Sequence, residues 1–144
     1  MRLHLLWLVI VLGFSGCADK YQHNPNLAAK KAEEFATLAF VKQDYDGAYA
    51  RLADGTRRYV TAAQFKQTLT KNQAESKPAK VVAKEYEPIG GEKAMYVYLT
   101  ASNGSGQFSF RITMEGTADS GYRVLRFDHG GFNLPSRQRK ILPE

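Results

Sequence analysis

The sequence has few of the residues on which common kinds of site depend. It contains one cysteine and three histidines among 144 residues. A single cysteine excludes a disulfide bond within the chain and a cluster of thiolate metal ligands. The sequence also lacks an HExxH motif, a pair of histidines at ligand spacing and an Asp-rich loop, which are the usual signatures of metal sites. We therefore expect neither a metal nor another cofactor.

The overall composition is nevertheless that of a folded domain. Hydrophobic residues make up 44% of the chain and charged residues 24%, which excludes wholesale disorder and a coiled coil. A chain of 144 residues has room for one hydrophobic core, so we expect a single domain. Lys and Arg number 20 against 14 Asp and Glu, a net charge of +6 that favours anionic neighbours such as phospholipid headgroups without selecting one.

Residues 1–16 are predicted to be a lipoprotein signal peptide. Arg2 precedes the uncharged apolar run 5–14, which is too short to span a bilayer as a mature helix. The motif FSGC at residues 14–17 resembles the bacterial lipobox, with Phe where Leu is usual. The resemblance implies that Cys17 receives a thioether-linked diacylglycerol, and the added acyl chains would form a stable anchor. The alternative is a chance cysteine near an ordinary signal-peptidase site.

Residues 17–25 would then be the lipidated cysteine and a short tether. The polar stretch 18–25 spans at most about 25 Å when extended, so we expect the domain to lie close to its membrane. In bacteria with two membranes, Asp directly after the cysteine resembles a signal for retention at the inner membrane, but Ala18 occupies that place here. The expected location is the cell envelope, on the periplasmic side of the outer membrane.

The first half of the domain is predicted to be helical. Apolar residues recur at helical spacing in three segments, residues 26–41, 44–53 and 61–72. Asp54-Gly55 resembles a glycine stop for the second helix. Thr61 and Gln64 match a capping box, in which each side chain bonds to the backbone N–H of the other residue, and so mark the start of the third helix.

After Pro78 the pattern alternates, which predicts an antiparallel meander of four strands. Pairing Ser102 with Gln107 places three apolar pairs on one face of the sheet: Leu99 with Phe110, Val97 with Ile112, and Met95 with Met114. These pairs predict that Phe110 is buried against the first helix, near Leu99, Phe127 and Phe35.

The two outer strands are extrapolated from that central pair. Placing Glu115 opposite Tyr122 puts Phe127 beside Phe110, Leu125 beside Ile112, and Arg123 beside Met114 on the apolar face. At the other edge of the sheet, two registers remain open. With a tight Gly90-Gly91 turn, the side chains that face the core are Val82, Lys84 and Tyr86. With a slip of one residue, they are Val81, Ala83 and Glu85.

Helices followed by an antiparallel sheet resemble the nuclear transport factor two-like superfamily. The resemblance covers residues 26–129 and is carried by element order, by DYDGAY at residues 44–49 and by VTAAQF at residues 60–65. It implies an α+β fold, a cone in which three helices pack on a curved antiparallel sheet. The superfamily includes ketosteroid isomerase and scytalone dehydratase, but the same cone also hosts binding modules and scaffolds.

No catalytic residue can be carried over from the enzymes of this superfamily, which place an Asp or His base inside the cone. Asp128 and His129 are adjacent at the end of a strand, where neighbouring side chains point to opposite faces. We therefore expect a domain that is not an enzyme. The candidate ligand-binding residues, which would line a polar cone for an acidic or amphiphilic ligand, are Tyr49, Lys84, Tyr86 and Arg123. Alternatively, Lys84 and Arg123 extend past apolar neighbours into water.

The opposite face of the sheet is a candidate interface. Tyr96, Tyr98 and Arg111 fall there with Arg126, so that Arg can stack on Tyr. A homodimer or an envelope protein partner would use this exposed face, and export to the envelope argues against nucleic acid. Residues 130–144 form a basic tail without helical or strand periodicity, either a solvated end or a contact for anionic headgroups.

The sequence thus predicts a lipid-anchored envelope protein whose domain binds a ligand or a protein partner without catalysis. One alternative is a scaffold component of an envelope assembly or secretion machine. Another is a small-molecule enzyme of the same fold, similar to the isomerase and the dehydratase.

Overall fold

The computed structural model describes residues 20–72, 77–130 and 138–143. The helical elements in these residues are α1 (Pro25–Ala36), a π-helical segment η1 (Thr37–Lys42), α2 (Tyr45–Tyr49), α3 (Asp54–Tyr59) and α4 (Ala62–Asn72). The strands are β1 (Lys80–Pro88), β2 (Ala94–Asn103), β3 (Gly106–Thr117), β4 (Gly121–His129) and β5 (Lys140–Ile141). They form one open antiparallel sheet in the order β4-β3-β2-β1-β5, which confirms the expected α+β class.

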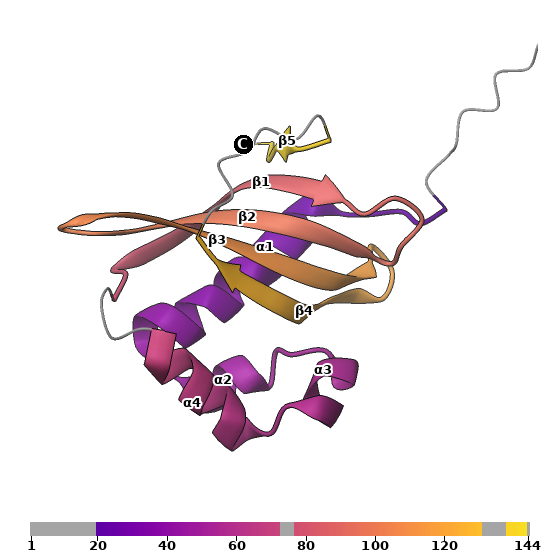
Figure 1. The fold of residues 1–144 in the computed structure, drawn as a ribbon. Coiled ribbons are helices and arrows are strands. Elements are labelled where there is room, and N and C mark those ends of the chain that lie inside the picture. The colour runs from indigo at the N-terminus through magenta and orange to yellow at the C-terminus, as the bar shows by residue number, and fades with distance from the viewer. Residues whose placement is uncertain (1–19, 73–76, 131–137, 144) are drawn as a thin grey trace, which may run out of the picture.

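Figure 1 shows α1 running along one face of the sheet, with α2, α3 and α4 gathered beside β4. Among the described residues, no helix is both long enough and apolar enough to cross a membrane.

The first helix begins where the sequence predicts. The Asn24 side chain accepts a hydrogen bond from the Leu27 N–H at 3.0 Å, and Pro25 occupies the first turn, where its missing N–H costs nothing. Alanines and Phe35 form the buried face of α1. The helix continues as η1, which buries Phe40 against the sheet and ends at Gln43 in a left-handed conformation.

The second predicted helix is shorter than expected, and the predicted stop at Gly55 is wrong. Helix α2 ends at Tyr49, and Asp54 begins the additional helix α3, which contains Gly55. The interruption arises because Leu52 bridges to Val124 of β4, and the Ala53 N–H donates to the Val124 carbonyl at 2.7 Å. A tertiary contact therefore divides a segment that has continuous helical periodicity.

The capping box before α4 is confirmed. The Thr61 N–H donates to Gln64 Oε1 at 2.9 Å, and the Gln64 N–H donates to Thr61 Oγ1 at 3.3 Å.

The central register is also confirmed, because β2 and β3 pair as the apolar pattern predicts. The observed pairs include Leu99 with Phe110, Val97 with Ile112 and Met95 with Met114. Phe110 is 3% exposed, and its ring stacks on Phe40 with 4.6 Å between centroids and 11° between planes. Phe35 packs against Phe127 at 5.8 Å, so aromatic rings connect α1, η1 and the sheet.

The predicted register between β3 and β4 is wrong by one residue from Met114 to Thr117 and by two residues from Phe110 to Thr113. Thr113 pairs with Arg126 while Met114 pairs with Val124, so Leu125 is an extra residue in a β-bulge. Next to the β3–β4 turn, Gly116 and not Glu115 pairs with Tyr122, so Glu115 faces Arg123, which is exposed and lies away from the core face. The further expected pairs are wrong too: Ile112 faces Phe127 instead of Leu125, and Phe110 faces His129 instead of Phe127.

A second bulge lies in β1, between Ala83 and Glu85. On one side of it Val81 and Ala83 pair with core residues, and on the other side Tyr86 pairs with Val97. Each of the two alternative registers therefore describes one half of the strand. Lys84 is the bulged residue and is exposed, so the prediction that it faces the helices is wrong.

Near the C-terminus, residues 140–142 join the sheet. Ile141 and Lys140 pair with Glu85 and Tyr86, and the Leu142 N–H donates to the Lys84 carbonyl at 3.0 Å. The sequence shows no strand periodicity here because β5 is only two residues long.

Candidate anion-binding site

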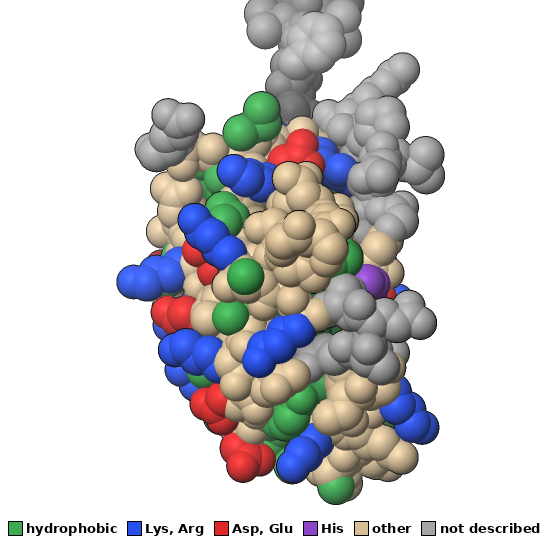
Figure 2. Space-filling view, turned by 90° about the vertical axis from the view of Figure 1, so that its left-hand side faces the viewer, with side chains coloured by type: hydrophobic (Ala, Val, Ile, Leu, Met, Phe, Trp, Pro, Cys, Tyr) green, Lys and Arg blue, Asp and Glu red, His purple; other side chains and the backbone are tan. Residues whose placement is uncertain are grey.

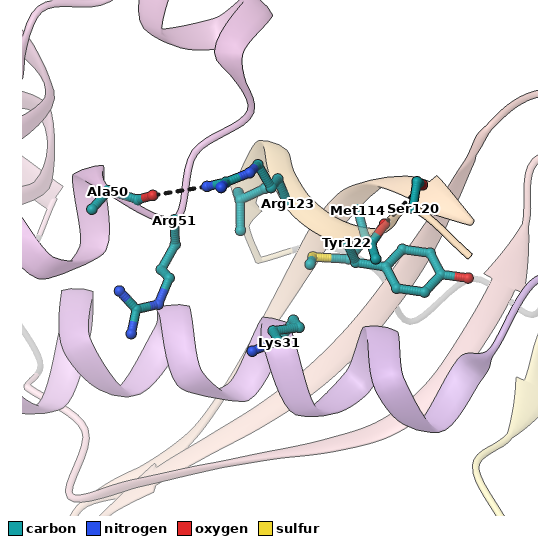
Figure 3. Close-up of a pocket in the computed structure, with 9 residues that line it drawn as sticks. Lys31, Ala50, Arg51, Met114, Ser120, Tyr122 and Arg123 are labelled. Atoms are coloured by element: carbon teal, nitrogen blue, oxygen red, sulfur yellow. Dashed lines mark hydrogen bonds between the residues drawn. The ribbon is translucent and has the colours of Figure 1, made fainter. Parts of the chain in front are cut away.

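A hollow of about 420 Å³ lies between α1, the turn after α2, and the β3–β4 hairpin. Its lining combines backbone, basic side chains and a small apolar floor: Lys31, Ala50, Arg51, Met114, Ser120, Gly121, Tyr122, Arg123 and Val124. Figure 3 shows the side chain of Arg51 extending towards α1, which carries Lys31, while Arg123 points to the carbonyl oxygen of Ala50.

The three basic side chains differ in how far their charges are balanced. Lys31 Nζ pairs with Glu34 Oε2 at 3.1 Å. Arg51 Nη1 donates to the Gly47 carbonyl at 3.4 Å, and Arg123 Nη1 donates to the Ala50 carbonyl at 3.1 Å. Within the described ranges, neither arginine forms an ion pair with a carboxylate.

The backbone holds the two arginines beside each other. The Val124 N–H, next to Arg123, donates to the Arg51 carbonyl at 3.0 Å. The same turn is fixed again by the bond from Ala53 to Val124. Arg51 and Arg123 are 72 positions apart in the sequence, yet their positions are set by one short stretch of paired backbone.

The surroundings of the hollow strengthen electrostatic attraction between its basic side chains and a negatively charged ligand. Met114 and Val124 are fully buried and form its apolar floor, which excludes water from one side and strengthens electrostatic attraction there. The field of Arg123 also reaches Asp54, whose pKa is lowered mainly by the hydrogen bond and charge of Arg57, with a smaller contribution from Arg123.

This arrangement fits an oxyanion. A guanidinium presents planar paired donors to a carboxylate or a phosphate, and an ammonium adds a point charge. The described residues contain no group of His, Cys, Asp and Glu that could hold a metal ion.

The four ligand-binding residues predicted from the sequence are not brought together, and only Arg123 lines this hollow. Tyr49 donates its hydroxyl to the Val60 carbonyl at 2.8 Å and packs on Phe65. Tyr86 packs half-buried against the core, and Lys84 lines a separate hollow with Tyr98 and Arg139.

Sequence reasoning missed Lys31 and Arg51. Lys31 lies among the polar residues of an amphipathic helix, and Arg51 follows a helix whose end the sequence misplaces. No local pattern signals that these residues meet Arg123, because a long-range backbone pairing brings them together.

The predicted interface face is only partly open. The Arg111 guanidinium lies over the Tyr96 ring at 4.8 Å, as the cation–π prediction expects. Tyr98, however, is 8% exposed, because Arg139 covers its ring at 3.8 Å. The expectation of an exposed Tyr98 is therefore wrong. Beside Tyr96 the face has a hollow of about 440 Å³ that includes Leu125.

Asp128 and His129 are adjacent in the sequence, but their side chains have different interaction partners. Asp128 accepts hydrogen bonds from Arg111 at 3.0 Å and from Arg126 at 2.6 Å. His129 meets the ring of Phe110 edge-on, with 4.9 Å between centroids. Both residues lie at the rim of a mainly apolar hollow of about 490 Å³ between α3, α4 and β4.

No protein-family model matches the chain, and no curated protein or solved structure matches it either. The fold and the geometry of the basic hollow therefore carry the functional proposal.

Proposed function

We propose that this chain is a lipid-anchored protein of the bacterial envelope whose domain binds a small anionic ligand without catalysing a reaction. The anchor is Cys17, which lies outside the described residues and is supported by the lipobox-like motif at residues 14–17. Helices packed on one face of an open antiparallel sheet agree with the element order of the nuclear transport factor two-like superfamily. That likeness supports the proposal that the chain is a member of this superfamily. Sorting to the periplasmic side of the outer membrane is proposed because Ala18, and not Asp, follows Cys17.

The observation that carries the binding proposal is the pair of arginines in the basic hollow. Arg51 and Arg123 bond neutral carbonyl groups there and have no carboxylate partner among the described residues. Lys31 adds a third positive charge, which Glu34 offsets in part. The volume of about 420 Å³ is within the range of small-molecule sites. A ligand with a carboxylate or phosphate group would satisfy both arginines.

The proposal can be tested by titrating the protein with inorganic phosphate and with acetate while the backbone amide resonances are followed by NMR. Shifts should concentrate at Arg51 and at residues 120–124, and Arg123→Gln should weaken them. Lys80→Gln is the matched control, because Lys80 is an exposed cation at the start of β1 and does not line the hollow. Equal binding by wild type and Arg123→Gln would show that the hollow is not the site.

A scaffold role is the second candidate, favoured by the open part of the sheet face. Leu125 is 38% exposed there, beside the stacked Tyr96 and Arg111. A second copy or another envelope protein would cover this hydrophobic and cationic surface. Photocrosslinking from position 96 in cells should then give a discrete adduct, and Tyr59, on the exposed surface of α3, provides the control position.

A further inference from the structure

The basic hollow lies where the tether enters the domain. The Gln22 carbonyl accepts a hydrogen bond from the Ala118 N–H at 2.9 Å, and the Asn24 N–H donates to the Tyr122 hydroxyl at 2.8 Å. Ala118 is in the β3–β4 turn, and Tyr122 lines the hollow. The residues just before α1 are therefore fixed to the same hairpin that forms one wall of the site.

Ring contacts hold the tether at a second position. The ammonium groups of Lys20 and Lys93 lie over the ring of Tyr21, at 5.4 Å and 5.3 Å from its centroid. Because Lys93 is in the β1–β2 turn, both turns at this end of the sheet are close to the tether. Cys17 precedes Lys20 by three residues, a span of at most about 10 Å. A lipid on Cys17 would therefore place this end of the domain against the membrane.

We infer that the basic hollow binds the phosphate group of an anionic phospholipid headgroup in the same membrane that holds the anchor. This inference rests on the proposed function and names its ligand. Arg51 and Arg123 supply planar donors that match phosphate oxygens, and Lys31 supplies a further charge. An anionic membrane surface adds an attraction that weakens within about 10 Å, a distance that the short tether keeps small.

Among the described residues, the end of the molecule opposite the tether carries charges of both signs. Figure 2 faces the end away from the tether, where basic and acidic side chains alternate along one side and do not form a patch of one sign. Such a mixed surface does not favour approach to an anionic membrane. The tether and the charge distribution therefore favour the same orientation of the domain.

The test uses the acylated full chain in four settings: neutral detergent micelles with and without inorganic phosphate, and nanodiscs of phosphatidylcholine or of phosphatidylcholine with phosphatidylglycerol. Backbone amide exchange at residues 120–124 is measured in each. Phosphatidylglycerol should slow this exchange by about fivefold for each basic side chain engaged, relative to phosphatidylcholine alone. Arg123→Gln and Lys31→Gln should each remove part of the effect, and Lys80→Gln should remove none.

The outcomes separate the two proposals. Protection by phosphatidylglycerol that depends on Arg123 supports a headgroup ligand. Equal exchange in both nanodiscs, or protection that survives both substitutions, overturns it. If inorganic phosphate in micelles still protects residues 120–124 in that case, the ligand is a free anion and the proposed function stands. If phosphate has no effect either, both proposals fall. A purified chain without lipid also overturns the inference, since nothing would then hold the hollow at a membrane.

Discussion

Glu33 of α1 accepts a hydrogen bond from the backbone N–H of Ala83, with 2.6 Å between Oε1 and the nitrogen. Ala83 directly precedes the bulged residue of β1. At a bulge the ladder is locally disrupted and a backbone group loses its strand partner. The helix thus supplies an acceptor where the sheet is irregular, and it ties α1 to a defined position along β1.

Removing this acceptor should destabilise the domain. Glu33→Ala leaves a half-buried N–H without its partner, which typically costs about 1–3 kcal/mol in the free energy of unfolding. Glu33→Gln keeps a carbonyl oxygen at the same reach and should cost less. Urea unfolding of the two variants checks this order, and equal midpoints would show that the bond contributes nothing.

Phe110 should be among the most sensitive core positions. It is 3% exposed and stacked on Phe40, so Phe110→Ala should cost about 3–5 kcal/mol of the free energy of unfolding. Tyr59 is 86% exposed and is the matched aromatic control, with an expected change within about 0.5 kcal/mol. Similar losses in the two variants, measured by thermal or urea unfolding, would contradict the observed packing.

Cys17→Ser should prevent acylation. The precursor would then keep its signal peptide and migrate more slowly on a gel, and metabolic labelling with a fatty acid should fail. A Ser15→Ala substitution leaves the cysteine in place and serves as the control. Unchanged mobility and unchanged fatty-acid labelling of Cys17→Ser would rule out the lipid anchor.

Stability at high pH should depend on Tyr98. Burial raises the pKa of its phenol above the usual value, and the hydrogen bond to Glu87 raises it further. The folded domain therefore holds this proton more tightly than the unfolded chain. This contribution to stability is complete below the unfolded pKa of about 10 and is lost as the pH rises through the folded pKa.

Tyr98→Phe should accordingly lose stability less steeply than the wild type between about pH 10 and pH 12. Tyr59→Phe, at an exposed position, should follow the wild type. Urea midpoints measured across this range give the comparison. A Tyr98→Phe profile that runs parallel to the wild type would contradict the raised pKa.

The centre of the fold could be predicted from the sequence because several signals agree there. Three apolar pairs in step define the register of β2 and β3, and a reciprocal pair of polar side chains marks the start of α4. The outer strands could not be predicted in the same way. A bulge reverses the alternation of faces, and neither Lys84 nor Leu125 is a residue type that marks one.

The register set by the β3–β4 turn helps to explain why the candidate site could be predicted only in part. Arg123 was identified for the wrong reason, since it lies outside the core face and reaches the hollow from the edge strand β4. Arg51 joins it through backbone pairing across the fold, and the sequence carries no local sign of that contact.

Part of β1 and part of β4, the long strands on the two sides of the sheet, is covered by the chain itself. The turn after α2 occupies the outer side of β4 at Val124, and β5 pairs with β1 at Glu85 and Tyr86. Unpaired strand edges are templates on which another chain can add a strand and begin aggregation. A lipid anchor would concentrate many copies in two dimensions, where such additions would be frequent. The turn after α2 and the two-residue strand β5 would then hinder crowded neighbours on one membrane from joining their sheets at these positions.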